Sequence, residues 1–272
     1  MAAVLFSTGG AAIKGTALAP VQVAGFRSGV AAIAMLLLLP AARQGLGRDL
    51  IPGAIAYALT LVSFVTATKL TTSGAAIFLQ STAPLWVVVL APMLLRERFE
   101  RRDLKYLGVA ALGLVLVFLG SQSAVATAPN PQLGNAIALG SGLSFALLLM
   151  AFRHLTRVDP LHDRSIPAAM LGNLLAFVLC MPFAFPVASV TTRDLLAIGY
   201  LGTVQVGLSY WFLSGGLRVL PALEASMLLL LEPVLNPVWT WLLHGERPSV
   251  LALAGGALLL TVLAVRAVRS PG

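Results

Sequence analysis

Charged residues are scarce in this chain, and their scarcity argues against an ordinary water-soluble protein. Only 10% of its 272 residues are Asp, Glu, Lys or Arg. They fall in short runs between apolar stretches of about 20 residues, the length that spans a bilayer as a helix. Backbone groups in lipid must pair within helices or closed barrels, and the alternating pattern of barrel strands is absent. The sequence therefore predicts an all-α membrane protein.

Cysteine, histidine and catalytic motifs are also rare or missing. Cys180 is the single cysteine, so no internal disulfide can form and no compartment can be inferred from it. The chain has no H-E-x-x-H, no complete G-x-S-x-G, no phosphate-binding loop and no cluster of Cys and His ligands. We expect no enzyme activity, no metal and no cofactor. Soluble segments of at most about 15 residues also exclude an ATP-driven pump, because a nucleotide-binding domain is far longer.

The apolar runs separate into ten segments, with boundary errors of about 2 to 4 residues. We place the spans at residues 2–18, 21–40, 51–69, 73–95, 104–121, 133–152, 165–185, 195–214, 222–243 and 249–267.

The chain repeats itself, since a mid-span proline followed by a Glu-Arg pair occurs twice at identical spacing. The two copies are Pro84, Glu97, Arg98 and Pro233, Glu246, Arg247. Five spans per half is an odd number, so the second half must enter the membrane upside down. We predict ten transmembrane helices in two inverted five-helix repeats, residues 1–121 and 133–272, joined by a periplasmic linker at 122–132.

The net charge of +8 is better explained by membrane topology than by nucleic-acid binding, because the basic residues lie at span ends and not in one patch. With the N-terminus inside, most of the 18 Lys and Arg residues fall on the inner side, as expected for cytoplasmic loops. Both termini are then cytoplasmic, with Glu97 inside and Glu246 outside. We expect the lipid bilayer and a small-molecule substrate as partners, and no nucleic acid.

These residues resemble the EamA family of the drug/metabolite transporter superfamily over essentially the whole chain. The second Gly-Glu-Arg corner and its Leu-Glu-Pro sequence fit the family closely, whereas the first repeat departs from the pattern at two positions. The residues that carry the resemblance are Lys14, Arg27, Pro84, Arg96-Glu97-Arg98, Leu231-Glu232-Pro233 and Gly245-Glu246-Arg247; the departures are Ala83 and Arg96.

The resemblance implies an inner-membrane secondary transporter that exports small amphiphilic metabolites, with amino acids as the foremost class, by alternating access. The chain would act as a monomer or a homodimer. The alternatives from other classes are a membrane-embedded enzyme and a non-transporting receptor. A cavity closed to both sides, or a cofactor at mid-membrane, would favour those alternatives.

Polar and aromatic side chains at mid-span are the candidates for substrate binding, because matching depths in the two repeats suit a cavity for an amphiphilic solute. In particular, Glu232, Asn236 and Trp239 share one helical face by their spacing. Some of these groups have structural alternatives, such as hydrogen bonds between helices or places in interfacial belts. The candidates are Tyr57, Thr60, Phe78, Gln80, Trp86, Gln205, Ser209, Tyr210, Asn236 and Trp239.

Five further residues are candidates for coupling or gating: Glu232, Pro84, Pro233, Arg27 and Lys14. Glu232 is the deepest ionisable group, so it faces a wet cavity, pairs with a cation or holds a proton; alternatively it only orders the proline-disturbed helix. Arg27 lies within Gly25-x-x-x-Gly29, a small-residue spacing that lets another helix approach closely. It either binds a substrate carboxylate or snorkels, as Lys14 does in its simpler interpretation.

Overall fold

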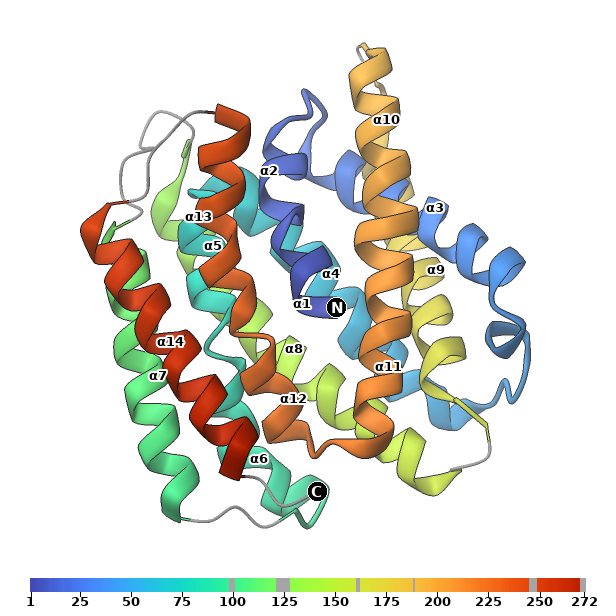
Figure 1. Ribbon diagram of the computed structural model, residues 1–272. Coiled ribbons are helices and arrows are strands. Elements are labelled where there is room, and N and C mark those ends of the chain that lie inside the picture. Colours follow the sequence, from blue (N-terminus) through green and yellow to red (C-terminus); the bar gives the residue numbers. More distant parts are fainter. Residues whose placement is uncertain (98–100, 121–127, 160–161, 188, 245–248, 270–272) are drawn as a thin grey trace.

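The computed structural model describes residues 1–97, 101–120, 128–159, 162–187, 189–244 and 249–269, and every regular element in these ranges is helical (Figure 1). The first half contains α1 (Ala2–Ser7), α2 (Gly9–Lys14), α3 (Pro20–Leu38), η1 (Pro40–Arg43), η2 (Arg48–Leu50), α4 (Ile51–Leu70), α5 (Ser73–Gln80), α6 (Ala83–Leu94) and α7 (Arg101–Gly120). The second half contains α8 (Pro131–Val158), α9 (Ser165–Ala184), α10 (Thr192–Tyr200), the π-helix η4 (Leu201–Leu208), α11 (Ser209–Val219), α12 (Ala222–Leu228), α13 (Leu231–His244) and α14 (Val250–Arg269).

Six helical stretches are long and apolar enough to cross a membrane, which indicates a multi-pass membrane protein. They are Pro20–Leu38, Arg48–Leu70, Ser73–Leu94, Pro131–Val158, Ser165–Ala184 and Thr192–Val219, and Ala2–Lys14 and Val250–Val265 are shorter apolar helices. Ser165–Ala184 matches its predicted span, but α8 continues six residues beyond the predicted end at 152. The last turns of α8 contain Arg153 and Arg157, which donate hydrogen bonds to Glu97 and to Leu95 O. The helix therefore continues beyond the end of the apolar run.

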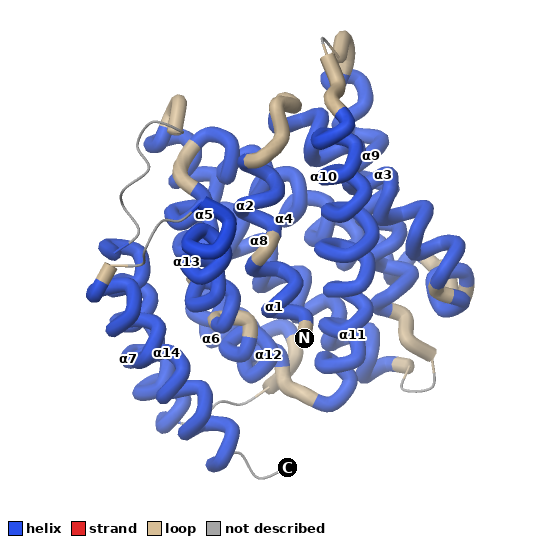
Figure 2. The backbone as a smooth tube through the Cα atoms, turned by 45° about the horizontal axis from the view of Figure 1, so that its top comes forward, coloured by secondary structure: helices blue, strands red, loops and turns tan. Residues whose placement is uncertain are grey.

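The helices form a bundle in which α4 packs against α8 and α9, and α3 packs against α9. The α3–α9 contact uses the predicted small-residue spacing, because a Cβ on Gly25 would lie 2.9 Å from Cys180 Cβ and one on Gly29 would lie 2.7 Å from Phe177 Cδ2. α7 and α14 pack against each other and lie together at one edge of the bundle (Figures 1 and 2). α1 lies near the middle of the same views.

Three of the predicted spans, 2–18, 73–95 and 222–243, each consist of two helices with a break between them. The breaks fall at Thr8, at Ser81-Thr82 and at Leu229-Leu230. Hydroxyl groups bond backward to the chain at the first two breaks: Thr8 Oγ1 donates to Leu5 O at 2.7 Å, and Ser81 Oγ donates to Ile77 O at 2.7 Å. Such bonds compete with the helical ladder.

The two repeated prolines lie just after breaks and not in the middle of a helix. Pro84 is in the first turn of α6 and Pro233 is in the first turn of α13. A proline is tolerated there because the first N–H groups of a helix have no intrahelical acceptor. The breaks between α5 and α6 and between α12 and α13 therefore correspond in the two halves of the chain.

We expect Gly172→Ala to destabilise the bundle by about 1–3 kcal/mol, the range for overpacking. Gly172 lies where α9 crosses α4, and a Cβ there would lie 2.6 Å from Tyr57 Cβ, an atom fixed to its helix. The matched control is Gly140→Ala in α8, where a Cβ meets no atom within 4 Å. Thermal unfolding in detergent should show a lower Tm for Gly172→Ala alone. Equal Tm values for the two variants would contradict this packing.

Candidate functional site

A small cavity lies between the two halves of the chain, and broken helices supply much of its wall. Gln80 ends α5, Glu232 opens α13, Phe6 lies in the last turn of α1, and Gln205 belongs to the π-helix. The described residues that line it are Phe6, Arg27, Thr60, Leu61, Phe64 and Gln80 from the first half, and Phe145, Gln205, Val206, Tyr210 and Glu232 from the second.

The cavity is narrow in this structure. Its lining residues are all buried, and its volume is only about 30 Å³. That is room for a few water molecules and not for a metabolite. The wall carries a guanidinium and a carboxylate among aromatic and amide groups, so it can bind a solute with both charged and apolar parts once it expands.

Arg27 is the most deeply buried charged side chain at the cavity. It is 1% exposed; its Nη1 lies 3.4 Å from Gln205 Oε1 and its Nη2 donates to Leu61 O at 3.2 Å. The Nε atom has no hydrogen-bond partner among the described residues. Gly9 makes room for Gln205, because a Cβ there would lie 2.6 Å from Gln205 Nε2. The guanidinium thus has N–H groups that its neutral partners do not use, and an anionic ligand can accept hydrogen bonds from them.

Glu232 faces the same cavity from the other half of the chain. It is 7% exposed and lies in the first turn of α13, near the positive end of that helix's dipole. No ion pair joins Glu232 to Arg27 in the described part of the chain. An arginine and a glutamate on separate walls of one cavity leave both side chains available to a bound solute.

Three other predicted residues line the cavity with Arg27, Gln205 and Glu232. Gln80 Nε2 donates to Ser141 Oγ at 2.8 Å, which links α5 to α8. Thr60 Oγ1 donates back to Ala56 O at 2.7 Å, so its hydroxyl is satisfied within α4. The Tyr210 ring packs edge-on against Phe6, with centroids 5.0 Å apart. Phe6 also meets Phe145 edge-on at 6.5 Å. Aromatic rings therefore close one side of the cavity.

Several predicted substrate residues lie outside this lining. Tyr57 is fully buried next to Tyr210, and its hydroxyl accepts a hydrogen bond from Asn173 Nδ2 at 2.8 Å. Trp86 packs against the core with Nε1 buried and without a described partner. Ser209 is buried, with Oγ 3.4 Å from Val204 O. Trp239 Nε1 donates to Ser7 Oγ at 2.7 Å, and thereby ties α13 to α1.

Phe78 and Asn236 line a second, smaller cavity of about 10 Å³ instead. Its wall includes Phe118 of α7, whose ring stacks on Phe78 with centroids 4.4 Å apart. The Asn236 Oδ1 atom is buried without a partner among the described residues. Spacing alone therefore places Glu232 and Asn236 on one face of α13, but the structure divides them between two cavities.

The π-helix explains the difference on the eighth predicted span. A regular α-helix would place Gln205 and Ser209 on one stripe, as the sequence predicts. A π-helix has i→i+5 hydrogen bonds, so the residue one turn after Gln205 is Tyr210. The cavity accordingly contains Gln205 and Tyr210, whereas Ser209 is turned away from it.

The remaining gating candidate, Lys14, lies at the end of α2 and bonds to another helix. Its Nζ donates to Thr71 O at 2.8 Å, just beyond α4. In the other direction, Lys69 in the last turn of α4 donates to Thr16 O at 2.7 Å, just beyond α2. The two lysines join the loop after α2 to the end of α4, so Lys14 is placed to hold this corner and does not reach the central cavity.

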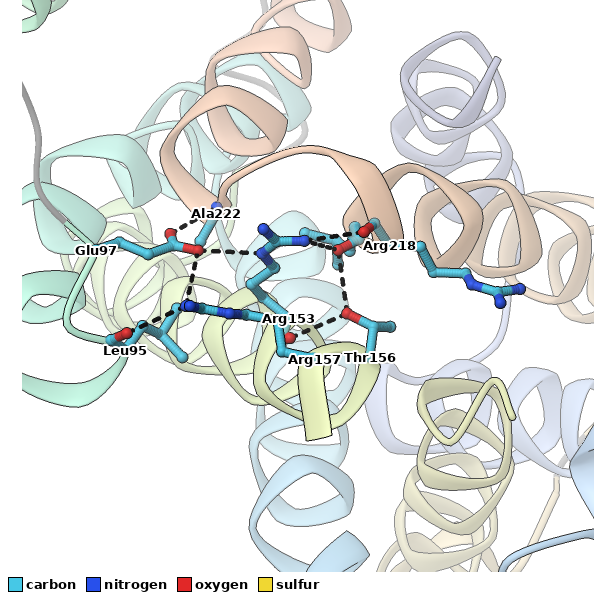
Figure 3. Close-up of polar contacts among 8 residues, drawn as sticks. Leu95, Glu97, Arg153, Thr156, Arg157, Arg218 and Ala222 are labelled. Atoms are coloured by element: carbon cyan, nitrogen blue, oxygen red, sulfur yellow. Dashed lines mark hydrogen bonds and ion pairs between the residues drawn. The ribbon is translucent and has the colours of Figure 1, made fainter. Parts of the chain in front are cut away.

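A cluster of charged residues lies at the end of the bundle where α6, α8 and α11 finish (Figure 3). Arg153 Nε donates to Glu97 Oε1 at 3.0 Å, and the Ala222 amide donates to Glu97 Oε2 at 3.1 Å. Arg153 Nη1 also donates to Leu217 O at 2.8 Å, which caps α11. Glu97 thus joins the first half to two segments of the second. Its partners Arg98, Glu246 and Arg247 in the repeat motif lie outside the described residues.

Comparison with known proteins was made on the whole sequence. The sequence profile of the EamA-like transporter family matches residues 1–119 and 132–266. An uncharacterized transporter of Archaeoglobus fulgidus is 26% identical over 230 residues, which are 83% of this chain and 79% of that protein. The uncharacterized transporter YdfC of Bacillus subtilis is 22% identical over 193 residues, which are 70% of this chain and 61% of that protein.

A crystal structure of another protein has a similar fold. It superposes with a TM-score of 0.78 at 19% identity and covers 99% of this chain and 96% of its own. At this identity the likeness concerns the fold alone.

Proposed function

Because the chain belongs to the EamA-like transporter family, whose profile covers both of its halves, we propose that it exports small amphiphilic metabolites across a cell's inner membrane as a secondary transporter. Amino acids are the substrate class that we favour. Residues 1–121 and 133–272 act as inverted five-helix repeats, joined by the periplasmic linker 122–132. Transport proceeds by alternating access around a site near mid-membrane.

The observation that carries the proposal is the cavity between the halves, with Arg27 on one wall and Glu232 on another. A guanidinium can bind a carboxylate with paired hydrogen bonds, and a carboxylate can hold a proton or an ammonium group. The rings of Phe6 and Tyr210 offer an apolar surface beside these charges. A solute with one carboxylate, one amine and an apolar body satisfies all three features.

A narrow cavity lined by buried residues is compatible with more than one class of protein. A transporter that binds its substrate between its two halves contains such a cavity, and so does an embedded enzyme or receptor. The family supports the transporter, because both relatives reported above are named as uncharacterized transporters.

Uptake into proteoliposomes tests the proposal. Purified protein should accumulate labelled neutral or aromatic amino acids faster than empty vesicles do, and an imposed pH gradient should change the rate. Basic amino acids serve as the comparison, because their side-chain cation would take the place of the apolar body beside Phe6 and Tyr210. No uptake of any amino acid above that of empty vesicles would overturn the proposed substrate class.

The inverted arrangement predicts opposite sidedness for the two repeat corners. α6 and α13 finish at opposite ends of the bundle in Figure 1, which supports this arrangement. We expect Glu100→Cys to react with an impermeant maleimide only from the cytoplasmic side and Arg247→Cys only from the outside. The single native cysteine, Cys180, is buried, so the background should be low. Equal labelling of both variants in intact cells would contradict the topology and the cytoplasmic placement of the termini.

A further inference from the structure

A groove on the outside of the bundle has the shape and charge of a lipid site. It lies between α4 and α8 beside the end of α6, and its volume is about 460 Å³. Its wall is largely apolar, and Ile55, Leu59 and Leu94 in it are 45%, 57% and 56% exposed. We call this feature the lateral groove. It is separate from the central cavity, because the two have no lining residue in common.

Ionisable groups occur in the lateral groove only at one end, among its described lining residues. These are Asp49, in η2 just before α4, and His154, in the last turns of α8. The wall runs from there to Leu59, ten residues further along α4, which is about 15 Å of helix. The groove therefore has one polar end and a long apolar body.

The polar end has a surplus of positive charge. Asp49 is neutralised by Arg164, whose Nη1 lies 2.7 Å from Asp49 Oδ2, and Glu97 is neutralised by Arg153. Glu97 also lies 3.5 Å from Arg157 Nη1, so two arginines share this one carboxylate and one positive charge is left over. Arg157 reaches the groove directly, because its Nη1 donates to Leu95 O at 3.2 Å and Leu95 is part of the wall. The Arg157 side chain is still 48% exposed, and His154, three residues earlier on α8, is exposed as well.

We infer that the lateral groove binds an anionic phospholipid, with an acyl chain along α4 and α8 and the phosphate at Arg157 and His154. An apolar body that ends in surplus positive charge matches a lipid with a negative head group, and basic pockets at the ends of membrane helices bind such head groups. A helix of a second copy would fill the apolar body but would leave the basic end without counter-charge.

Lipid titration of the purified full-length protein, followed by native mass spectrometry, tests this site. The probes are phosphatidylglycerol and phosphatidylcholine with the same acyl chains, and glycerol 3-phosphate as the head group without chains. Phosphatidylglycerol should bind about fivefold more tightly than phosphatidylcholine for each basic residue that contacts it. Arg157→Gln should reduce that preference about fivefold, and His154→Gln, which removes a ring donor and not a permanent charge, should reduce it less. Leu59→Trp should weaken both lipids by filling the groove.

The controls separate this site from general lipid binding and from misfolding. Leu253→Trp adds the same ring at a site in α14 that is 60% exposed and outside the groove, and should leave both affinities unchanged. His154→Gln leaves the Glu97 cluster intact, so it tests the contact with the head group even where Arg157→Gln does not fold.

Three results would overturn the site: equal binding of the two lipids by the unmodified protein, equal effects of Leu59→Trp and Leu253→Trp, or binding of glycerol 3-phosphate as tight as that of the anionic lipid. A Leu59→Trp protein that changes from dimer to monomer without a change in lipid binding would instead assign the groove to a second copy.

Discussion

A Glu232→Gln protein is expected to transport at the same rate with and without a pH gradient, whereas the unmodified protein should respond to the gradient. Glu232 is the one carboxylate among the described lining residues of the central cavity. A proton carried across the membrane needs a group that can release it on both sides, and glutamine cannot. Since the substitution keeps size and hydrogen-bonding capacity, folding should survive. Uptake into proteoliposomes at matched and unmatched pH measures the effect.

The control for Glu232→Gln is Glu224→Gln in α12, which removes a carboxylate from the same half but outside the cavity lining. It should retain the response to the gradient. A well-expressed Glu232→Gln protein with the full response would show that this carboxylate has a structural role only, by ordering the start of α13 before Pro233.

Arg27→Met is expected to raise the KM for an amino acid by roughly 10- to 100-fold, the loss that corresponds to a charge-assisted hydrogen bond. The guanidinium is buried and touches only neutral groups in the described structure. Replacing a buried charge by an apolar side chain of similar length is often neutral or stabilising. Tm should therefore stay the same or rise while transport declines, and this split distinguishes ligand binding from structural support.

A second variant and a second substrate test whether Arg27 binds the carboxylate. Arg27→Lys keeps the charge but loses the planar fork, so its KM should lie between those of the unmodified protein and Arg27→Met. An amine analogue without the carboxylate should be transported equally well by all three proteins. An equal loss for the amino acid and for its amine analogue would show that Arg27 does not bind the carboxylate.

The positions of the helices were predictable because lipid leaves few options to a long apolar run. Runs of about 20 residues must be helical, and the observed helices begin and end near the predicted spans. The prediction failed where an end is decided by side-chain partners, as at Arg153 of α8, which pairs with Glu97. It also failed at the breaks, because Ser81 and Thr82 are compatible with a helix and interrupt it only through local hydroxyl bonds.

The cavity was predictable only in part, and the reason is geometric. Arg27, Gln80 and Glu232 stand out in the sequence because polar groups at mid-span are costly in lipid and face the interior. Ser209 was assigned by a spacing of 3.6 residues per turn, which η4 does not keep. Phe6 and Phe145 were missed, since an aromatic residue in an apolar span gives no sign of whether it faces a cavity, a helix or lipid.

The central claim is that the cavity opens to each side of the membrane in turn, and reactivity of a Thr60→Cys protein tests it most directly. Thr60 lines the cavity and is 2% exposed, and a Cys180→Ser background removes the native thiol. In oriented proteoliposomes, a small impermeant thiol reagent should modify residue 60 from either side, and substrate supplied on one side should shift the balance between the two rates. A thiol that reacts from one side only, or from neither, would contradict alternating access and favour a receptor or an embedded enzyme.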